Sequence, residues 1–187
     1  EHTEATESAK SNIVTTSELK FKLDDKKLIT LKLDGETKAG KPAIMRFDGV
    51  IHLLKGRDAI EKRDFHYYTP KSVIPDGIKL IKSEFESPKI LLDTIELDLK
   101  QIPRFEKLEI YIGNYSGPGR DSYDIKDFKT LFMEVAIENE VIAIIDIKKA
   151  PGVYKHNHSA QVLKIVSKDA SHFELTNTAN SRKHLYR

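Results

Sequence analysis

Two aspartates lie at the ends of a loop between two predicted strands, and they form the first candidate site. Asp34 follows an alternating apolar run at residues 29–33, and Asp48 lies in a second apolar run at residues 43–54. Apolar residues at every second position indicate a strand with one buried face. Residues 34–42 are therefore expected to connect two strands, with one carboxylate near each end.

Two further patterns could carry chemistry, and both favour an ordinary loop. His156 and His158 would share one face of a strand and could bind a transition metal, but no third ligand is evident near them. A solvated loop is therefore the favoured interpretation. The run Gly117-Pro118-Gly119-Arg120 lacks the Gly-Lys-Ser/Thr ending of a phosphate-binding loop, so it is interpreted as a turn.

Catalytic motifs are not found in the sequence. It contains neither a nucleophile elbow nor a His-Glu-x-x-His motif, and it has no cysteine. We therefore predict that the protein is not an enzyme. The lack of cysteine also excludes disulfides and zinc–sulfur sites. A set of aromatic residues fits a core or one sheet face better than a binding face; its members are Phe65, Tyr67, Tyr68, Tyr111 and Tyr115.

The elements that position these residues are predicted to be strands. Ten or so short runs, each bounded by turn residues, indicate an all-β fold, an antiparallel β-sandwich with few short helical turns. A charged loop is expected at residues 55–63, with helical turns near 59–62 and 124–128. Strand pairs are predicted as a hairpin at 17–33, a central pair of 94–99 with 108–112, and two hairpins at 128–147 and 161–175.

Length and charge indicate one domain with polar ends. The 187 residues divide into a polar tail at 1–16, a domain at 17–178 and a basic tail at 179–187. Thirty-one basic and 29 acidic residues are too evenly balanced to suggest a nucleic-acid partner. The N-terminal residues have no apolar core like that of a signal peptide, so a cytoplasmic location is expected.

The order of the motifs resembles one known family. Residues 31–34 correspond to a Gly-Leu-Gly-Trp-Asp strand end, and residues 46–54 to Asp-Leu-Asp-Ala-Ser-Ala-Phe-Leu-Leu. Residues 64–68 correspond to Asp-Phe-x-Phe-Tyr-Asn-Asn, and residues 97–112 to a Leu-x-x-Val-Pro turn with its following strand. Over residues 17–178 the chain therefore resembles the TerD-like family of tellurium-resistance and general stress proteins. That resemblance implies a small β-sandwich that binds calcium.

The calcium site implied by the resemblance departs from the family pattern. Its ligands here would be Asp34, Asp48, Glu84 and Asp93, but residues 83–93 lack the glycines of the family's calcium loop. Calcium takes six to eight oxygen ligands, and Arg46 stands where the family has an aspartate. We expect Arg46 to pair with a nearby carboxylate and to replace the cation as a structural bridge. The alternative to a calcium site is that these four acids are ordinary solvated residues at loop ends.

Three functions remain open at this point. The resemblance favours a non-enzymatic scaffold or binding module of a stress-response system, with calcium binding weakened or lost. Its partners would be other proteins of that system, some of them membrane-associated, and no nucleic acid is expected. The alternatives are a calcium-dependent sensor that uses the remaining carboxylates, or an unrelated sandwich that binds a small molecule or peptide beside Tyr67 or Tyr68.

Overall fold

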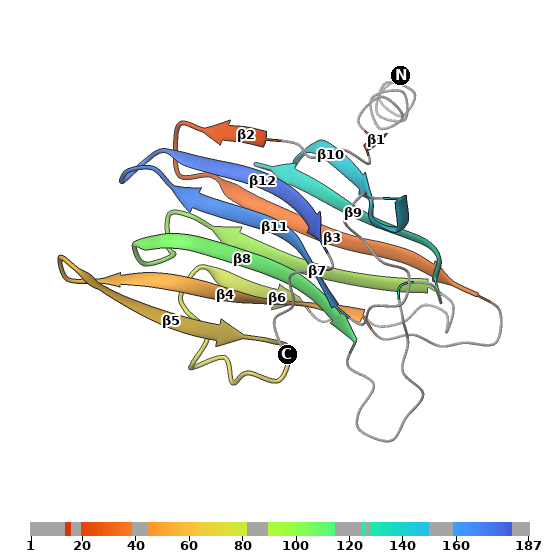
Figure 1. The fold of residues 1–187 in the computed structure, drawn as a ribbon, viewed down its shortest axis with the longest axis horizontal. Coiled ribbons are helices and arrows are strands. Elements are labelled where there is room, and N and C mark those ends of the chain that lie inside the picture. The colour runs from red at the N-terminus through yellow and green to blue at the C-terminus, as the bar shows by residue number, and fades with distance from the viewer. Residues whose placement is uncertain are drawn as a thin grey trace.

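Two six-stranded sheets lie face to face in the computed structural model (Figure 1). The structure describes residues 14–15, 20–38, 45–81, 90–114, 125, 128–149 and 159–180. Sheet A has the strand order β1-β10-β9-β3-β7-β6, and sheet B has the order β2-β12-β11-β8-β4-β5. The pairings are antiparallel, apart from the two-residue parallel pairing of β1 with β10. The predicted all-β sandwich is therefore confirmed.

The strands divide equally between the two sheets. Sheet A contains β1 (Val14–Thr15), β3 (Leu28–Thr37), β6 (Ile78–Ile81), β7 (Ile90–Asp98), β9 (Phe128–Ile137) and β10 (Glu140–Asp146). Sheet B contains β2 (Lys20–Leu23), β4 (Met45–Lys55), β5 (Ala59–Phe65), β8 (Phe105–Asn114), β11 (Ser159–Ser167) and β12 (Phe173–Asn180). A short 3-10 turn, η2 (Ile147–Lys149), follows β10.

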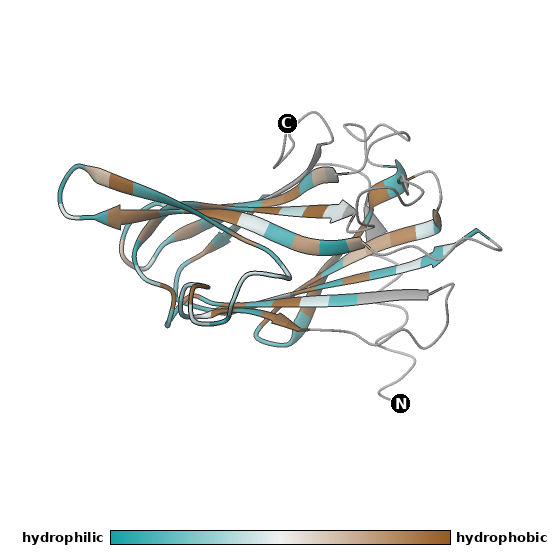
Figure 2. Cartoon of the chain, turned by 90° about the horizontal axis from the view of Figure 1, so that it is seen from below, coloured by the Kyte–Doolittle hydropathy of each residue, from teal (hydrophilic) through white to brown (hydrophobic). Residues whose placement is uncertain are grey.

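The core lies between the two sheets and comes from the alternation seen in the sequence. Along β3, Leu31 and Leu33 are fully buried, whereas Lys32 and Asp34 are exposed on the outer face of sheet A. Apolar and hydrophilic residues alternate along the strands in the same way across both layers (Figure 2). Because successive side chains of a strand point to opposite faces, each sheet contributes one apolar face to the core.

Two of the predicted strand pairs are confirmed, and two are wrong. The hairpins β9–β10 and β11–β12 form as predicted. The predicted hairpin at 17–33 does not, because β2 pairs with β12 in sheet B while β3 pairs with β7 and β9 in sheet A. The predicted central pair of 94–99 with 108–112 is also split, since β7 belongs to sheet A and β8 to sheet B.

The predicted charged loop at residues 55–63 is confirmed only as a turn at 56–58, and the helical turn predicted near 59–62 is wrong. Residues 59–65 form the edge strand β5, which pairs with β4 from Lys55↔Ala59 to Gly49↔Phe65. Of the second predicted helical turn, at 124–128, the structure describes a 3-10 residue at Ile125 and the start of β9 at Phe128. Val14–Thr15, inside the predicted N-terminal tail, pairs with β10.

Within the described ranges, no helix has the length and apolar character needed to cross a membrane.

Candidate functional site

A buried carboxylate connects the two sheets. Asp93 on β7 shares the inner face of sheet A with Ile95 and Leu97, and only 5% of it is exposed. Its Oδ2 accepts a hydrogen bond of 2.9 Å from the backbone N–H of Phe47 on β4, in the opposite sheet. Since β5 begins its pairing with β4 only at Gly49, this N–H lies beyond the end of the β4–β5 ladder. Asp93 therefore supplies the partner that this backbone group would otherwise lack.

Arg46 completes what we call the inter-sheet cluster, formed by Arg46, Tyr67, Asp93 and the Phe47 amide. Arg46 Nη1 lies 3.7 Å from Asp93 Oδ1, and the two side chains are only 9% and 7% exposed. The guanidinium carbon stands 4.1 Å above the ring centroid of Tyr67, a cation–π arrangement. The buried positive charge is thus held between a carboxylate and an aromatic face.

The inter-sheet cluster changes how Asp93 titrates. Burial raises the pKa of Asp93 to about 6, although the Phe47 N–H and the positive charge of Arg46 lower it. Burial has the larger effect because Arg46 approaches only one carboxylate oxygen, at a distance longer than a strong charge-assisted hydrogen bond. The cluster is therefore sensitive to mildly acidic pH.

The other predicted calcium ligands do not join Asp93. Asp34 is exposed on the outer face of sheet A, the face opposite to that of Asp93. Asp48 is buried on the outer side of β4, across from Tyr111 on β8. Within the described residues, no group of three or more acidic or histidine side chains could hold a metal ion. Glu84 lies outside the described residues, so the four-residue ligand set stays a prediction.

The remaining candidate residues have different locations. Phe65 is fully buried in the core, and Tyr67 and Tyr68 contact each other edge to face with ring centroids 5.0 Å apart. The predicted histidine pair at 156 and 158, the turn at 117–120 and Tyr115 all lie outside the described residues. Among the predicted aromatic residues that the structure describes, Tyr67 is the one that contributes to the inter-sheet cluster.

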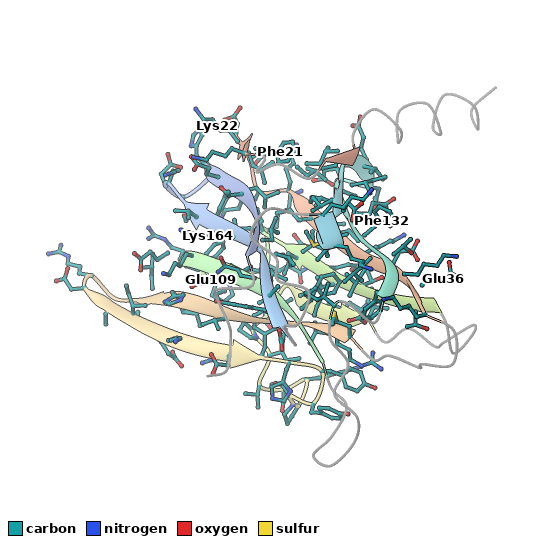
Figure 3. All side chains as sticks on the ribbon, turned by 45° about the vertical axis from the view of Figure 1, so that its right-hand side comes forward. Phe21, Lys22, Glu36, Glu109, Phe132 and Lys164 are labelled. Carbon is teal, nitrogen blue, oxygen red and sulfur yellow. The ribbon has the colours of Figure 1, made fainter. Side chains whose placement is uncertain are left out.

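A second polar cluster, on the outer face of sheet B, was not predicted. Glu109 on β8 is its centre: Oε2 accepts hydrogen bonds from Gln161 Nε2 at 2.6 Å and from the Tyr111 hydroxyl at 3.0 Å. Oε1 lies 3.2 Å from His52 Nε2 and 3.6 Å from Lys107 Nζ. Figure 3 labels Glu109 beside Lys164, its register partner on β11. Three neighbouring strands thus direct donors at one carboxylate.

The electrostatics of this cluster follow from its donors. Burial raises the pKa of Glu109, but the Tyr111 hydrogen bond, Lys107 and His52 outweigh it and hold the pKa below the ordinary value. Burial and the nearby charge of Glu109 raise the pKa of Tyr111. The sequence contains one local signal, the i, i+2 spacing of Glu109 and Tyr111 on a single strand face. Gln161 becomes their neighbour only because β11 pairs with β8.

Comparison with known proteins gives matches at the level of structure. No protein-family model and no curated protein matches the sequence. The crystal structure of a protein of unknown function matches with a TM-score of 0.57 and 14% identity, covering 81% of this chain and 87% of that one. A homologue of the telluride resistance protein TerD from Streptomyces coelicolor A3(2) matches with a TM-score of 0.55 and 9% identity, covering 81% and 88%. The fold is TerD-like. At such low identity the likeness concerns the fold alone.

One end of the TerD-like sandwich carries a tight polar turn between β11 and β12. Asp169 Oδ1 accepts hydrogen bonds from the Ser171 and His172 amides, both at 2.9 Å, and lies 2.7 Å from His172 Nδ1. Ser171 Oγ is 3.3 Å from the same ring nitrogen. In a catalytic relay, the acid and the nucleophile contact different nitrogens of the histidine ring. Here Asp169 and Ser171 both lie against His172 Nδ1, so these contacts stabilise the turn.

This turn gives a prediction about the titration of His172. Asp169 raises the pKa of His172 above its ordinary value, through a hydrogen bond and through its charge. Replacing Asp169 with asparagine should therefore lower the pKa of His172 toward that of a solvated histidine, which an NMR titration of the ring proton measures. An unchanged His172 titration in the variant would contradict the proposed pairing.

Proposed function

We propose that this TerD-like chain is a non-enzymatic binding or scaffold module of a stress-response system of the tellurium-resistance kind, and that it works without bound calcium. The likeness to a TerD homologue supports the fold-level part of this proposal. The partners would be other proteins of that system, some of them membrane-associated, and the balanced charge argues against a nucleic-acid role.

The position of Arg46 is the observation that supports a function without bound calcium. Its guanidinium lies 3.7 Å from the carboxylate of Asp93, which is one of the predicted calcium ligands. A divalent cation bound to Asp93 would experience direct repulsion from this buried positive charge. Asp93 also accepts the Phe47 amide hydrogen bond, so one of its oxygens is already used. Arg46 thus supplies the positive charge that an ion would otherwise bring between the sheets.

The same contacts support a non-enzymatic role. A residue with a strongly shifted pKa in a cleft is a candidate for catalysis, but ion-pair networks shift pKa values too. The carboxylate of Asp93 is buried between the sheets and held by its partners, and Glu109 is engaged by its four neighbours. Both acids therefore serve to connect strands.

Thermal unfolding with and without calcium tests this proposal. We expect the melting temperature to be the same with saturating calcium and with a chelator. A sensor saturated at about 100 times its dissociation constant would gain about 2.7 kcal/mol, or roughly 5–10 °C for a domain of this size. A rise of that size would contradict the proposal and would favour the calcium-dependent sensor.

The Arg46→Asp variant is the matched test of the same idea. It restores the acidic residue that the TerD-like motif has at this position. If Arg46 stands in for the ion, the variant should melt at a lower temperature than the parent and recover part of the loss when calcium is added. Recovery with calcium but not with potassium separates coordination from simple charge screening.

A further inference from the structure

A hollow of about 200 Å³ opens at the end of the sandwich far from the inter-sheet cluster. Leu54 on its rim is eight residues along β4 from Arg46, which corresponds to about 26 Å of extended strand. The turns β4–β5, β11–β12 and β2–β3 gather at this end of the molecule, on the left in Figure 1. Both sheets contribute to its walls, through Leu99 and Ile102 after β7 and Phe105 and Phe173 in sheet B.

The floor of the hollow is apolar and firmly packed. Leu99, Ile102, Phe105 and Phe173 are all buried, and the rings of the two phenylalanines stack with centroids 5.8 Å apart. Backbone hydrogen bonds fix the surrounding segments, with the Leu99 N–H donating to the Lys27 carbonyl at 3.1 Å. The Leu54 N–H donates to the Arg104 carbonyl at 2.9 Å. A ligand would therefore find preformed walls and would not have to order a loop.

The rim of the hollow carries an excess of available positive charge. Its cations are Lys26, Arg104 and Lys168, and its acids are Glu106 and Asp169. Asp169 is engaged by the His172 ring and two backbone amides, and Lys168 lies 3.8 Å from Glu174. Within the described part of the chain, Lys26, Arg104 and Glu106 form no ion pair, so two cations and one acid remain and the rim keeps an excess of one positive charge beside an apolar floor.

We propose that this hollow binds a small organic anion whose apolar body carries one carboxylate. The body would lie against the floor residues, where burial of apolar surface favours binding. The carboxylate would lie at the rim between Lys26 and Arg104, where a guanidinium can donate two parallel hydrogen bonds. The hollow is smaller than the roughly 300–1,000 Å³ of sites for drug-sized ligands, which limits the body to one ring or a short chain. This site is separate from the inter-sheet cluster and does not depend on the scaffold function.

An NMR titration of the full chain with benzoate tests the proposal, and benzamide is the neutral probe of the same shape. We expect benzoate to shift the backbone amides of Leu99, Ile102, Phe105 and Phe173 in a saturable way, and benzamide to bind about tenfold more weakly. Equal binding of the two probes, or shifts scattered over the surface, would overturn the proposal.

Variants assign the binding to the hollow itself. Lys26→Gln and Arg104→Gln should each weaken benzoate binding by about threefold, together the tenfold preference over benzamide, and leave benzamide binding unchanged. Lys32→Gln, the same change of charge on the exposed outer face of sheet A, is the matched control and should have no effect. Ala170→Phe should fill the opening and abolish benzoate binding while the melting temperature stays near that of the parent. Full binding in the Ala170→Phe or Arg104→Gln variant would overturn the site.

A peptide arm distinguishes the source of the carboxylate. N-acetyl-Ala-Ala-Phe and its C-terminal amide present the same ring, with and without a free terminal carboxylate. If the free acid of the peptide binds no more tightly than benzoate does, the result supports a small-molecule site. Binding of the free acid at least tenfold tighter than benzoate would overturn that assignment and would make the hollow a receptor for the C-terminus of a protein chain.

Discussion

Replacement of Arg46 by methionine is expected to lower the free energy of unfolding by about 3–5 kcal/mol near neutral pH, the usual effect of removing one partner from a buried ion pair. Methionine keeps a long unbranched side chain, so the loss reports the missing guanidinium more than a cavity. Asp93 would keep the Phe47 N–H but lose the positive charge 3.7 Å from its Oδ1. Urea-induced unfolding of parent and variant measures the difference.

The same loss should become much smaller at mildly acidic pH. Burial raises the pKa of Asp93 to about 6 in the folded parent, and removal of Arg46 takes away an influence that lowers it. Because the folded-state pKa lies above the unfolded value, the folded state takes up a proton first as the pH falls. Protonation of Asp93 therefore contributes about 3 kcal/mol to the free energy of unfolding of the parent. This contribution is present below about pH 4 and is lost as the pH rises through about 6. A neutral Asp93 no longer needs the guanidinium.

The Asp93→Asn variant provides the control for this pH dependence. Asparagine keeps an oxygen that can accept the Phe47 N–H, but it cannot titrate. The pH-dependent part of the Arg46→Met effect should therefore disappear in the Asp93→Asn background, which a double-mutant cycle at two pH values measures. If Arg46→Met costs the same at pH values near 5 and 7.5 in the native background, the charge of Asp93 is not what Arg46 stabilises.

A methyl group at Gly49 should be almost as harmful, and for a steric reason. Its Cβ would lie 2.4 Å from Phe65 Cζ and 2.8 Å from the carbonyl oxygen of Glu109. Phe65 is fully buried, and the carbonyl belongs to the backbone of β8, so neither can easily move. We expect Gly49→Ala to cost about 3 kcal/mol, at the upper end of typical overpacking effects. Urea-induced unfolding again gives the value.

A rescue and a control make the Gly49 prediction specific. Phe65→Leu in the Gly49→Ala background should recover part of the loss, because leucine lacks the ring atoms that clash. Gly56 has a φ of +72°, and a methyl group there would have no atom within 4 Å, so Gly56→Ala should cost about 1 kcal/mol from backbone strain alone. Equal costs at the two glycines would argue against close packing of Phe65 over Gly49.

The sequence was sufficient for the fold class, but it could not assign strands to sheets. Alternation in β2 and β3 identifies the buried face of each strand and contains no information about the partner strand. The four residues between them, 24–27, are long enough to cross the roughly 10 Å between two packed sheets. A short connection therefore fits both a hairpin and a step between sheets. Only the pairing of β2 with β12, far along the chain, places β2 in sheet B and not beside β3.

Charge patterns explain the other misassignments. β5 presents Glu61, Lys62, Arg63 and Asp64 in succession, and this run looks like a solvated loop. Charged residues of this kind are what an edge strand uses to prevent pairing with another molecule. The pairing of Arg46 with a carboxylate was expected from the resemblance, but its partner Asp93 and its contact with Tyr67 depend on how the two sheets meet. The Glu109 cluster could not be predicted, since its members lie on three different strands.

The strand order also determines when the newly made chain can reach its folded state. β2 pairs with β12 through Lys20↔Thr176, and the central strand β3 pairs Ile29 with Ile137. Such distant pairings place folding in the range of milliseconds to seconds. At a synthesis rate of about 5–20 residues per second, the ribosome needs on the order of ten seconds to travel from the first partner to the last. The early strands therefore emerge long before their partners, and this protein can complete both sheets only after its last strand has left the ribosome.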